Sequence, residues 1–184
     1  MNFSYKEQVI NLSDNFIRIK IDDMYAHKIS QFVQNLIGFK SSEQHHIIDN
    51  NREYKRFYTG FLGEAALEKY LGISIIDWSI GNSKNYHTPD IPGYRVGIKT
   101  VEYGKFPIIF KHNTYAQIIC IRSTQQKNLI YICGLATPSV LNMYQSDALI
   151  LDTNLRNRGT KTGFYGFNQL KYSIELSDLD QYKK

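Results

Sequence analysis

Two apolar runs in the second half of the chain constrain the fold more than any other feature. Residues 116–121 and 128–133 are mostly isoleucine, other apolar residues and cysteine. Short runs of this kind are typical of strands that are covered on both faces. We therefore expect two central strands in a sheet with packed layers on either side, and a further strand over residues 106–111.

Helical and turn signals surround these runs. Residues 15–21 alternate isoleucine with charge, which predicts a half-buried strand, and an apolar stripe then predicts a helix from about residue 23 to residue 37, ended by Gly38. A second helix is predicted over residues 58–71, with Gly72 as its stop, followed by a short strand over 73–76. A third begins at Pro138.

Asp90 and Lys99 belong to one predicted hairpin. An extended segment ends at Asp90, Pro92-Gly93 marks a turn over residues 91–94, and residues 95–101 form the next strand. Because strand side chains alternate between faces, Lys99 shares a face with Gly97. A lysine within an apolar strand is disfavoured unless its ammonium group is solvated or paired, so Lys99 is a candidate functional residue.

The combination of a carboxylate and a lysine suits phosphodiester hydrolysis. A divalent cation polarises the phosphate and lowers the pKa of a water molecule, and oxygen ligands such as the Asp90 carboxylate suit Mg²⁺ or Mn²⁺. A lysine ammonium group near the attacking water or the developing negative charge supplies a second cation. Together these residue types indicate a metal-dependent hydrolase.

Pro89, Asp90 and Lys99 resemble the motif of the PD-(D/E)xK nuclease superfamily, and Glu64 on the preceding helix resembles a glutamate that many members carry. The resemblance covers roughly residues 58–137. It implies a restriction-endonuclease-like αβββ core, with a mixed central sheet flanked by helices, in an α/β protein. It also implies that Glu64, Asp90 and Lys99 are catalytic, and that Asp90 and Glu64 hold Mg²⁺ or Mn²⁺.

Gly97 departs from the motif, because the superfamily has an acidic residue two positions before the lysine. Glu64 with Asp90 and the Ile98 carbonyl oxygen could suffice for one metal ion; Glu102 could act as a substitute metal ligand; or the site could be inactive. On a regular strand Glu102 points away from Lys99, so its use would require a bulge near residues 103–104. We favour Glu64 with Asp90.

A formal net charge of +5 favours an acidic partner, for which nucleic acid is the commonest candidate. Basic side chains that could track a phosphate backbone flank the hairpin and gather late in the chain. The late segment, residues 156–167, is also rich in glycine and predicts a mobile loop that clamps nucleic acid. The candidate nucleic-acid-binding residues are Arg95, Lys105, Lys111, Arg156, Arg158 and Lys161.

Length and composition predict one domain over residues 1–184, with an N-terminal strand-helix extension (1–57), a nuclease-like core (58–150) and a basic C-terminal segment (151–184). No apolar run approaches the ~20 residues of a membrane span, and the N-terminus lacks a secretory pattern, so we expect a cytoplasmic protein. Cys120 and Cys133 lie in apolar strands and read as reduced core residues rather than zinc ligands.

These observations predict a metal-dependent endodeoxyribonuclease, and cutting both strands of a duplex often calls for a homodimer. Two alternatives remain open. A protein of the same fold that has lost catalysis through Gly97 would bind nucleic acid without cutting it. A protein-interaction module, with its basic residues merely solvated, would do neither.

Overall fold

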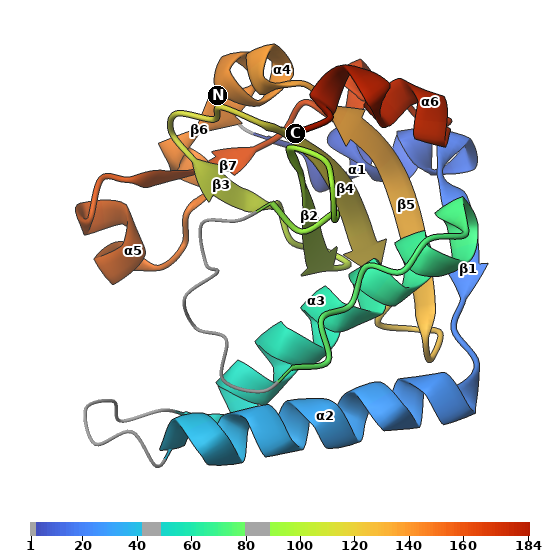
Figure 1. Ribbon diagram of the computed structural model, residues 1–184. Helices are drawn as coiled ribbons and strands as arrows, with labels where there is room; N and C mark the ends of the chain where they lie inside the picture. Colours follow the sequence, from blue (N-terminus) through green and yellow to red (C-terminus); the bar gives the residue numbers. More distant parts are fainter. Residues whose placement is uncertain (1–2, 42–48, 80–88) are drawn as a thin grey trace.

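The computed structural model describes residues 3–41, 49–79 and 89–184. Residues 81–88, a polar stretch before Pro89 that the sequence favours as a loop, lie outside these ranges. At its centre is a mixed sheet of β1 (Ile17–Lys20), β2 (Val96–Glu102), β4 (Ala116–Arg122) and β5 (Leu129–Ala136) in the order β1-β5-β4-β2 (Figure 1). Strand β2 is parallel to β4, whereas β4 and β5, and β5 and β1, are antiparallel. The predicted mixed α/β architecture is confirmed, and the two apolar runs form its inner strands.

Two long helices cover one face of this sheet. Helix α3 (Asn50–Leu71) packs on the strands, and α2 (Asp23–Ser41) packs on α3 (Figure 1). A β-carbon on Gly63 of α3 would lie 1.8 Å from Thr100 Oγ1 of β2, so glycine allows the closest approach between helix and sheet. Both helices are longer than predicted: α2 continues past Gly38, and α3 begins after an Asp49 cap that accepts bonds from two backbone amides.

The opposite face is covered by a second, small sheet of β3 (Ile108–Phe110), β7 (Lys161–Phe164) and β6 (Gln145–Ser146), in the order β3-β7-β6. The N-terminal helices α1 (Tyr5–Gln8) and η1 (Ile10–Asn15) and the helix α4 (Pro138–Met143) complete this layer. The predicted strand at 106–111 is therefore in the second sheet. The prediction of a mobile loop at 156–167 is wrong, because residues 161–164 pair with β3 and bury Phe164 in the core.

Short helices connect the remaining segments. They are η3 (Asp147–Leu149), α5 (Thr153–Asn157), η4 (Phe167–Gln169), α6 (Leu176–Leu179) and η5 (Asp180–Tyr182). Within the described ranges, no helix has the length and apolar character needed to cross a membrane.

The strand predicted at residues 73–76 does not form. The Glu68 carboxylate accepts hydrogen bonds from the backbone N–H groups of Ile75 (2.7 Å) and Ile76 (2.9 Å), and from the Tyr25 hydroxyl (2.6 Å). A side chain of α3 thus satisfies the donors that a neighbouring strand would otherwise use. Both isoleucines still enter the core, so the apolar pattern correctly predicted burial but not conformation.

Candidate functional site

The candidate site begins at the outer edge of β2, where Asp90 takes the place of a neighbouring strand. Asp90 Oδ2 accepts a hydrogen bond from the Ile98 N–H at 2.6 Å, and the Ile91 N–H donates to the Val96 carbonyl at 3.1 Å. The predicted turn over 91–94 is present, with Gly93 at φ 81° and Tyr94 N–H bonded to the Ile91 carbonyl. Asp90 itself lies in this turn region and not in a strand.

The Ile98 carbonyl faces the same open edge as Asp90. In an extended strand the N–H and C=O groups of one residue point to the same side, and the Ile98 N–H already points to Asp90. The edge therefore presents a carboxylate and a backbone oxygen side by side. Both are hard oxygen donors of the type that Mg²⁺ and Mn²⁺ prefer.

Lys99 lies beside Asp90 in a cleft between β2, the start of β4 and the small sheet. The cleft has a volume of about 130 Å³, which is room for about four water molecules or one phosphate group. Its lining combines one carboxylate, two lysines and an amide with aromatic and aliphatic side chains. The lining residues are Asp90, Gly97, Ile98, Lys99, Ile108, Ile109, Phe110, Tyr115, Gln117 and Lys161.

The electrostatics of the cleft weaken the proton affinity of Lys99. Burial, together with the nearby cations Lys161 and Arg56, lowers the pKa of its ammonium group to about 8, and the Asp90 carboxylate opposes this shift. The Asp90 residue retains exposed surface, but protein atoms crowd its carboxyl group, and this desolvation raises its pKa against the Ile98 hydrogen bond and the Lys99 charge. The cleft therefore combines a net positive field with one carboxylate.

Gly97 is surrounded at the position where an acidic side chain would begin. A β-carbon there would lie 3.0 Å from Tyr115 Cε2, 3.4 Å from Asp90 Oδ2 and 3.6 Å from Gln117 Cγ. The Tyr115 ring thus packs into space that the acidic residue of the nuclease motif would occupy. An acid at position 97 would be in tight contact with that ring and would require it to shift, which favours glycine at this position.

Gln117 is the site residue that sequence reasoning missed. It pairs in register with Gly97 across β2 and β4, and its side chain faces the cleft although the residue is only 7% exposed. Within the described residues its amide group has no protein hydrogen-bond partner and keeps contact with the space of the cleft. A signal was present in the sequence: Gln117 is the one polar residue in the run 116–121.

Glu64 approaches the same edge from the other face of the sheet. Its neighbour Gly63 contacts Thr100, whereas Lys99 points to the opposite face, so Glu64 does not line the cleft with Lys99. It is nevertheless close enough to Asp90 for the two charges to interact: burial, Asp90, Glu68 and Asp77 raise its pKa well above the ordinary value. A cation bound between the two carboxylates would offset the repulsion by Asp90 that contributes to the raised pKa of Glu64.

Glu102 lies elsewhere. It follows Ile98 by four strand residues, about 13 Å along β2, and on the alternating pattern it points away from Lys99. Its carboxylate pairs with Lys105 at 2.7 Å and lies 4.0 Å from Arg122, and the Lys105 hydrogen bond lowers its pKa. The structure does not bring Glu102 to Asp90.

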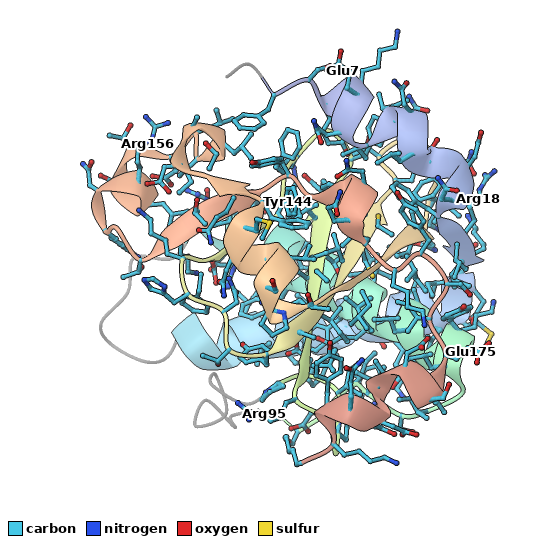
Figure 2. All side chains as sticks on the ribbon, turned by 90° about the horizontal axis from the view of Figure 1, so that it is seen from above. Glu7, Arg18, Arg95, Tyr144, Arg156 and Glu175 are labelled. Carbon is cyan, nitrogen blue, oxygen red and sulfur yellow. The ribbon has the colours of Figure 1, made fainter. Side chains whose placement is uncertain are left out.

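The six basic residues predicted to bind nucleic acid do not form one surface. Lys161 lines the cleft, with its ammonium group 5.3 Å from the centre of the Phe110 ring. Lys105 and Lys111 are paired with Glu102 and Asp147. Arg95 and Arg156 lie on separate parts of the molecule (Figure 2), Arg156 donates to the Ile150 carbonyl, and Arg158 is exposed at the end of α5.

The donor chemistry around the β2 edge fits a hard divalent cation. The described residues contain no group of three or more histidine, cysteine, aspartate or glutamate side chains suited to a metal. The candidate ligands are oxygen donors: the Asp90 carboxylate and the Ile98 carbonyl at the sheet edge, with the Glu64 carboxylate on the α3 face and the Gln117 amide oxygen on the opposite, cleft face. Such a set matches Mg²⁺ or Mn²⁺ better than zinc.

Comparisons of this chain with protein-family models, with curated proteins and with solved structures give no match.

Proposed function

We propose that this protein is a metal-dependent nuclease that hydrolyses phosphodiester bonds in DNA. The observation that carries the proposal is the convergence of the Asp90 carboxylate and the partly buried Lys99 ammonium group in one cleft at the open edge of the central sheet. The order of helix, Asp90 turn and Lys99 strand supports a restriction-endonuclease-like core, which is part of the same proposal.

Each group has a distinct task in this proposal. Asp90, with Glu64 and the Ile98 carbonyl, would hold Mg²⁺ or Mn²⁺, which when bound polarises a phosphate and lowers the pKa of water. The Lys99 ammonium group orients the attacking water or balances charge that develops on the phosphate. Lys161, at the rim beside Phe110, contributes a second cation to the phosphate-binding field.

The net charge of +5 and the cationic cleft support an anionic polymer as substrate, and DNA is our first choice. Only Lys161, of the six basic residues predicted to bind nucleic acid, lines the cleft. Contacts outside the cleft would then position the polymer rather than take part in hydrolysis. Cleavage of both strands would require two copies of the site, as in a homodimer.

The test is cleavage of supercoiled plasmid and of single-stranded and branched DNA with Mg²⁺ or Mn²⁺. We expect Asp90→Asn and Lys99→Met to reduce the rate at least 100-fold, in line with the loss of a transition-state contact. The matched controls are Asp180→Asn and Lys127→Met, which alter exposed residues in ion pairs that do not line the cleft. Chelation by EDTA should abolish cleavage by the wild type.

The outcomes separate the candidate functions. Metal-dependent cleavage that both site variants lose supports the nuclease. Salt-sensitive DNA binding without cleavage supports an inactive binding protein, for which the Tyr115 ring against Gly97 provides a reason. Neither activity, in a folded wild type, supports a protein-interaction module.

A further inference from the structure

We infer that Gln117 supplies the oxygen ligand that the acidic residue before Lys99 provides in the nuclease motif, so that the metal site spans two strands instead of one. The inference rests on the proposed metal-dependent function and concerns how this chain completes that site without an acid at position 97. It assigns a metal-binding role to a residue on β4.

The first support is position. Gly97 and Gln117 are register partners on the parallel strands β2 and β4. Asp90 Oδ2 and Gln117 Cγ lie 3.4 Å and 3.6 Å from the point where a Gly97 β-carbon would stand. The carboxylate and the Gln117 side chain therefore approach the Gly97 position from opposite sides of β2, beside the Tyr115 ring and within the cleft that Lys99 also lines.

The second support is the unmet hydrogen-bonding capacity of the amide. Gln117 is 7% exposed, and within the described ranges no protein group is hydrogen-bonded to its side-chain oxygen or nitrogen. The amide is nevertheless not among the fully buried side-chain atoms without a partner in these ranges, which are Tyr5 Oη and Thr100 Oγ1. The amide therefore faces the open space of the cleft, while aliphatic side chains occupy the neighbouring positions of β4. A polar group without a protein partner, facing a cleft with a carboxylate, can offer its oxygen to a ligand.

The third support is steric. A β-carbon at position 97 would lie 3.0 Å from Tyr115 Cε2, so an acidic side chain there would require the ring to move, whereas a side chain from position 117 reaches the cleft beside that ring. A neutral amide oxygen is an acceptable ligand for hard divalent cations but a weaker one than a carboxylate. The site should consequently bind Mn²⁺ more weakly than one with a carboxylate at this position.

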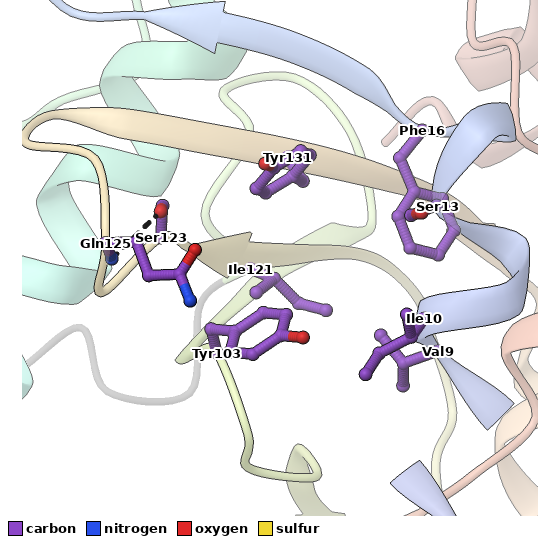
Figure 3. Close-up of a pocket in the computed structure, with 9 residues that line it drawn as sticks. All are labelled: Val9, Ile10, Ser13, Phe16, Tyr103, Ile121, Ser123, Gln125 and Tyr131. Atoms are coloured by element: carbon purple, nitrogen blue, oxygen red, sulfur yellow. Dashed lines mark hydrogen bonds between the residues drawn. The ribbon is translucent and has the colours of Figure 1, made fainter. Parts of the chain in front are cut away.

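The experiment measures Mn²⁺ binding to the full chain without nucleic acid, by calorimetry and by NMR of the glutamine side-chain amides. Mn²⁺ should broaden the Gln117 amide signals first. The signals of Gln125 should persist, because Gln125 lies beyond the other end of β4 in a separate pocket with Tyr103 and Tyr131 (Figure 3). The strand from 117 to 122 alone spans about 17 Å.

Three variants complete the test. Gln117→Met should weaken Mn²⁺ binding at least tenfold, Gln117→Glu should tighten it about tenfold, and Gln125→Met should leave it unchanged. If Gln117→Met fails to fold, Gln117→Glu and the broadening of the wild-type signals still decide.

The failures are distinguishable. Wild-type Mn²⁺ binding that Asp90→Asn abolishes, but that neither Gln117 variant changes, overturns the role of Gln117 and leaves the proposed nuclease standing. No Mn²⁺ binding by the folded wild type overturns both. Binding that depends on Asp90 and Gln117, without DNA cleavage, supports the ligand assignment and refutes the nuclease.

Discussion

Lys99→Met should make the protein more stable at neutral pH, because the cleft holds an ammonium group at a cost in folding free energy. Burial and the neighbouring cations lower the pKa of Lys99 from 10.5 to about 8. That difference corresponds to about 3 kcal/mol at most. Methionine keeps much of the aliphatic stem but forfeits the attraction to Asp90, so we expect a net gain of about 1–3 kcal/mol in the free energy of unfolding at pH 7.

The stabilising effect of Lys99→Met should depend on pH, because the folded and unfolded chains release the Lys99 proton at different pH values. Between pH 8 and 10.5 the unfolded chain keeps the proton on Lys99 whereas the folded protein releases it, so the stability contributed by this group rises with pH. The loss of folding stability caused by burying the charged Lys99 ammonium group is fully present below pH 8 and is absent above pH 10.5. The advantage of Lys99→Met should therefore shrink by about 1.4 kcal/mol per pH unit across this window.

The assay is urea unfolding of both proteins in EDTA from pH 7 to pH 10. Other groups also titrate here: burial raises the pKa of Tyr5 to about 12, and burial raises the pKa values of both cysteines, so absolute stabilities should fall at high pH. The difference between the two proteins cancels these contributions. An advantage that is absent at pH 7, or that does not change between pH 8 and 10, would refute the electrostatic account of Lys99.

Three further predictions concern packing, hydrogen bonding and thiol chemistry. Gly63→Ala should destabilise the protein by about 3 kcal/mol or more, because its β-carbon would overlap Thr100 Oγ1. Gly60→Ala lies on the same helix with open space around it, and should stabilise the protein by about 0.5–1 kcal/mol. Thermal unfolding of the two variants tests both predictions. Glu68→Ala should lower the free energy of unfolding by about 2–4 kcal/mol, because it removes the hydrogen-bond acceptor for Ile75, Ile76 and Tyr25. Glu53→Ala breaks an exposed ion pair with Arg56 and should change the free energy of unfolding by no more than about 0.5 kcal/mol. Equal effects of the two substitutions would contradict the role of Glu68 as a hydrogen-bond acceptor. Cys120 and Cys133 are fully buried with raised thiol pKa values, so a thiol reagent should label them only at the rate of unfolding, and rapid labelling of native protein would exclude the packing described.

The sequence alone determined the elements whose patterns are local and strong. The apolar runs of β4 and β5, the amphipathic helix before Gly72 and the Pro92-Gly93 turn were all predictable, because periodicity and turn chemistry depend on neighbouring residues. Alternation along β2 also correctly placed Gly97 and Lys99 on one face, with Glu102 on the other.

The tertiary structure decided what depends on distant partners. Whether residues 73–76 form a strand depended on Glu68, one side chain on another element. Residues 161–164 form a strand because they pair with β3, which lies about fifty positions earlier in the chain. Burial could be read from apolar pattern, but hydrogen-bond partners could not.

The candidate site shows the same division. Sequence spacing brought Asp90 and Lys99 together, because one turn connects them. Gln117 lies in the site because β2 and β4 pair in parallel register, although β3 separates these two strands in the sequence. Local sequence carries no information about such a register, since it is set by how two separate strands pack in the folded protein.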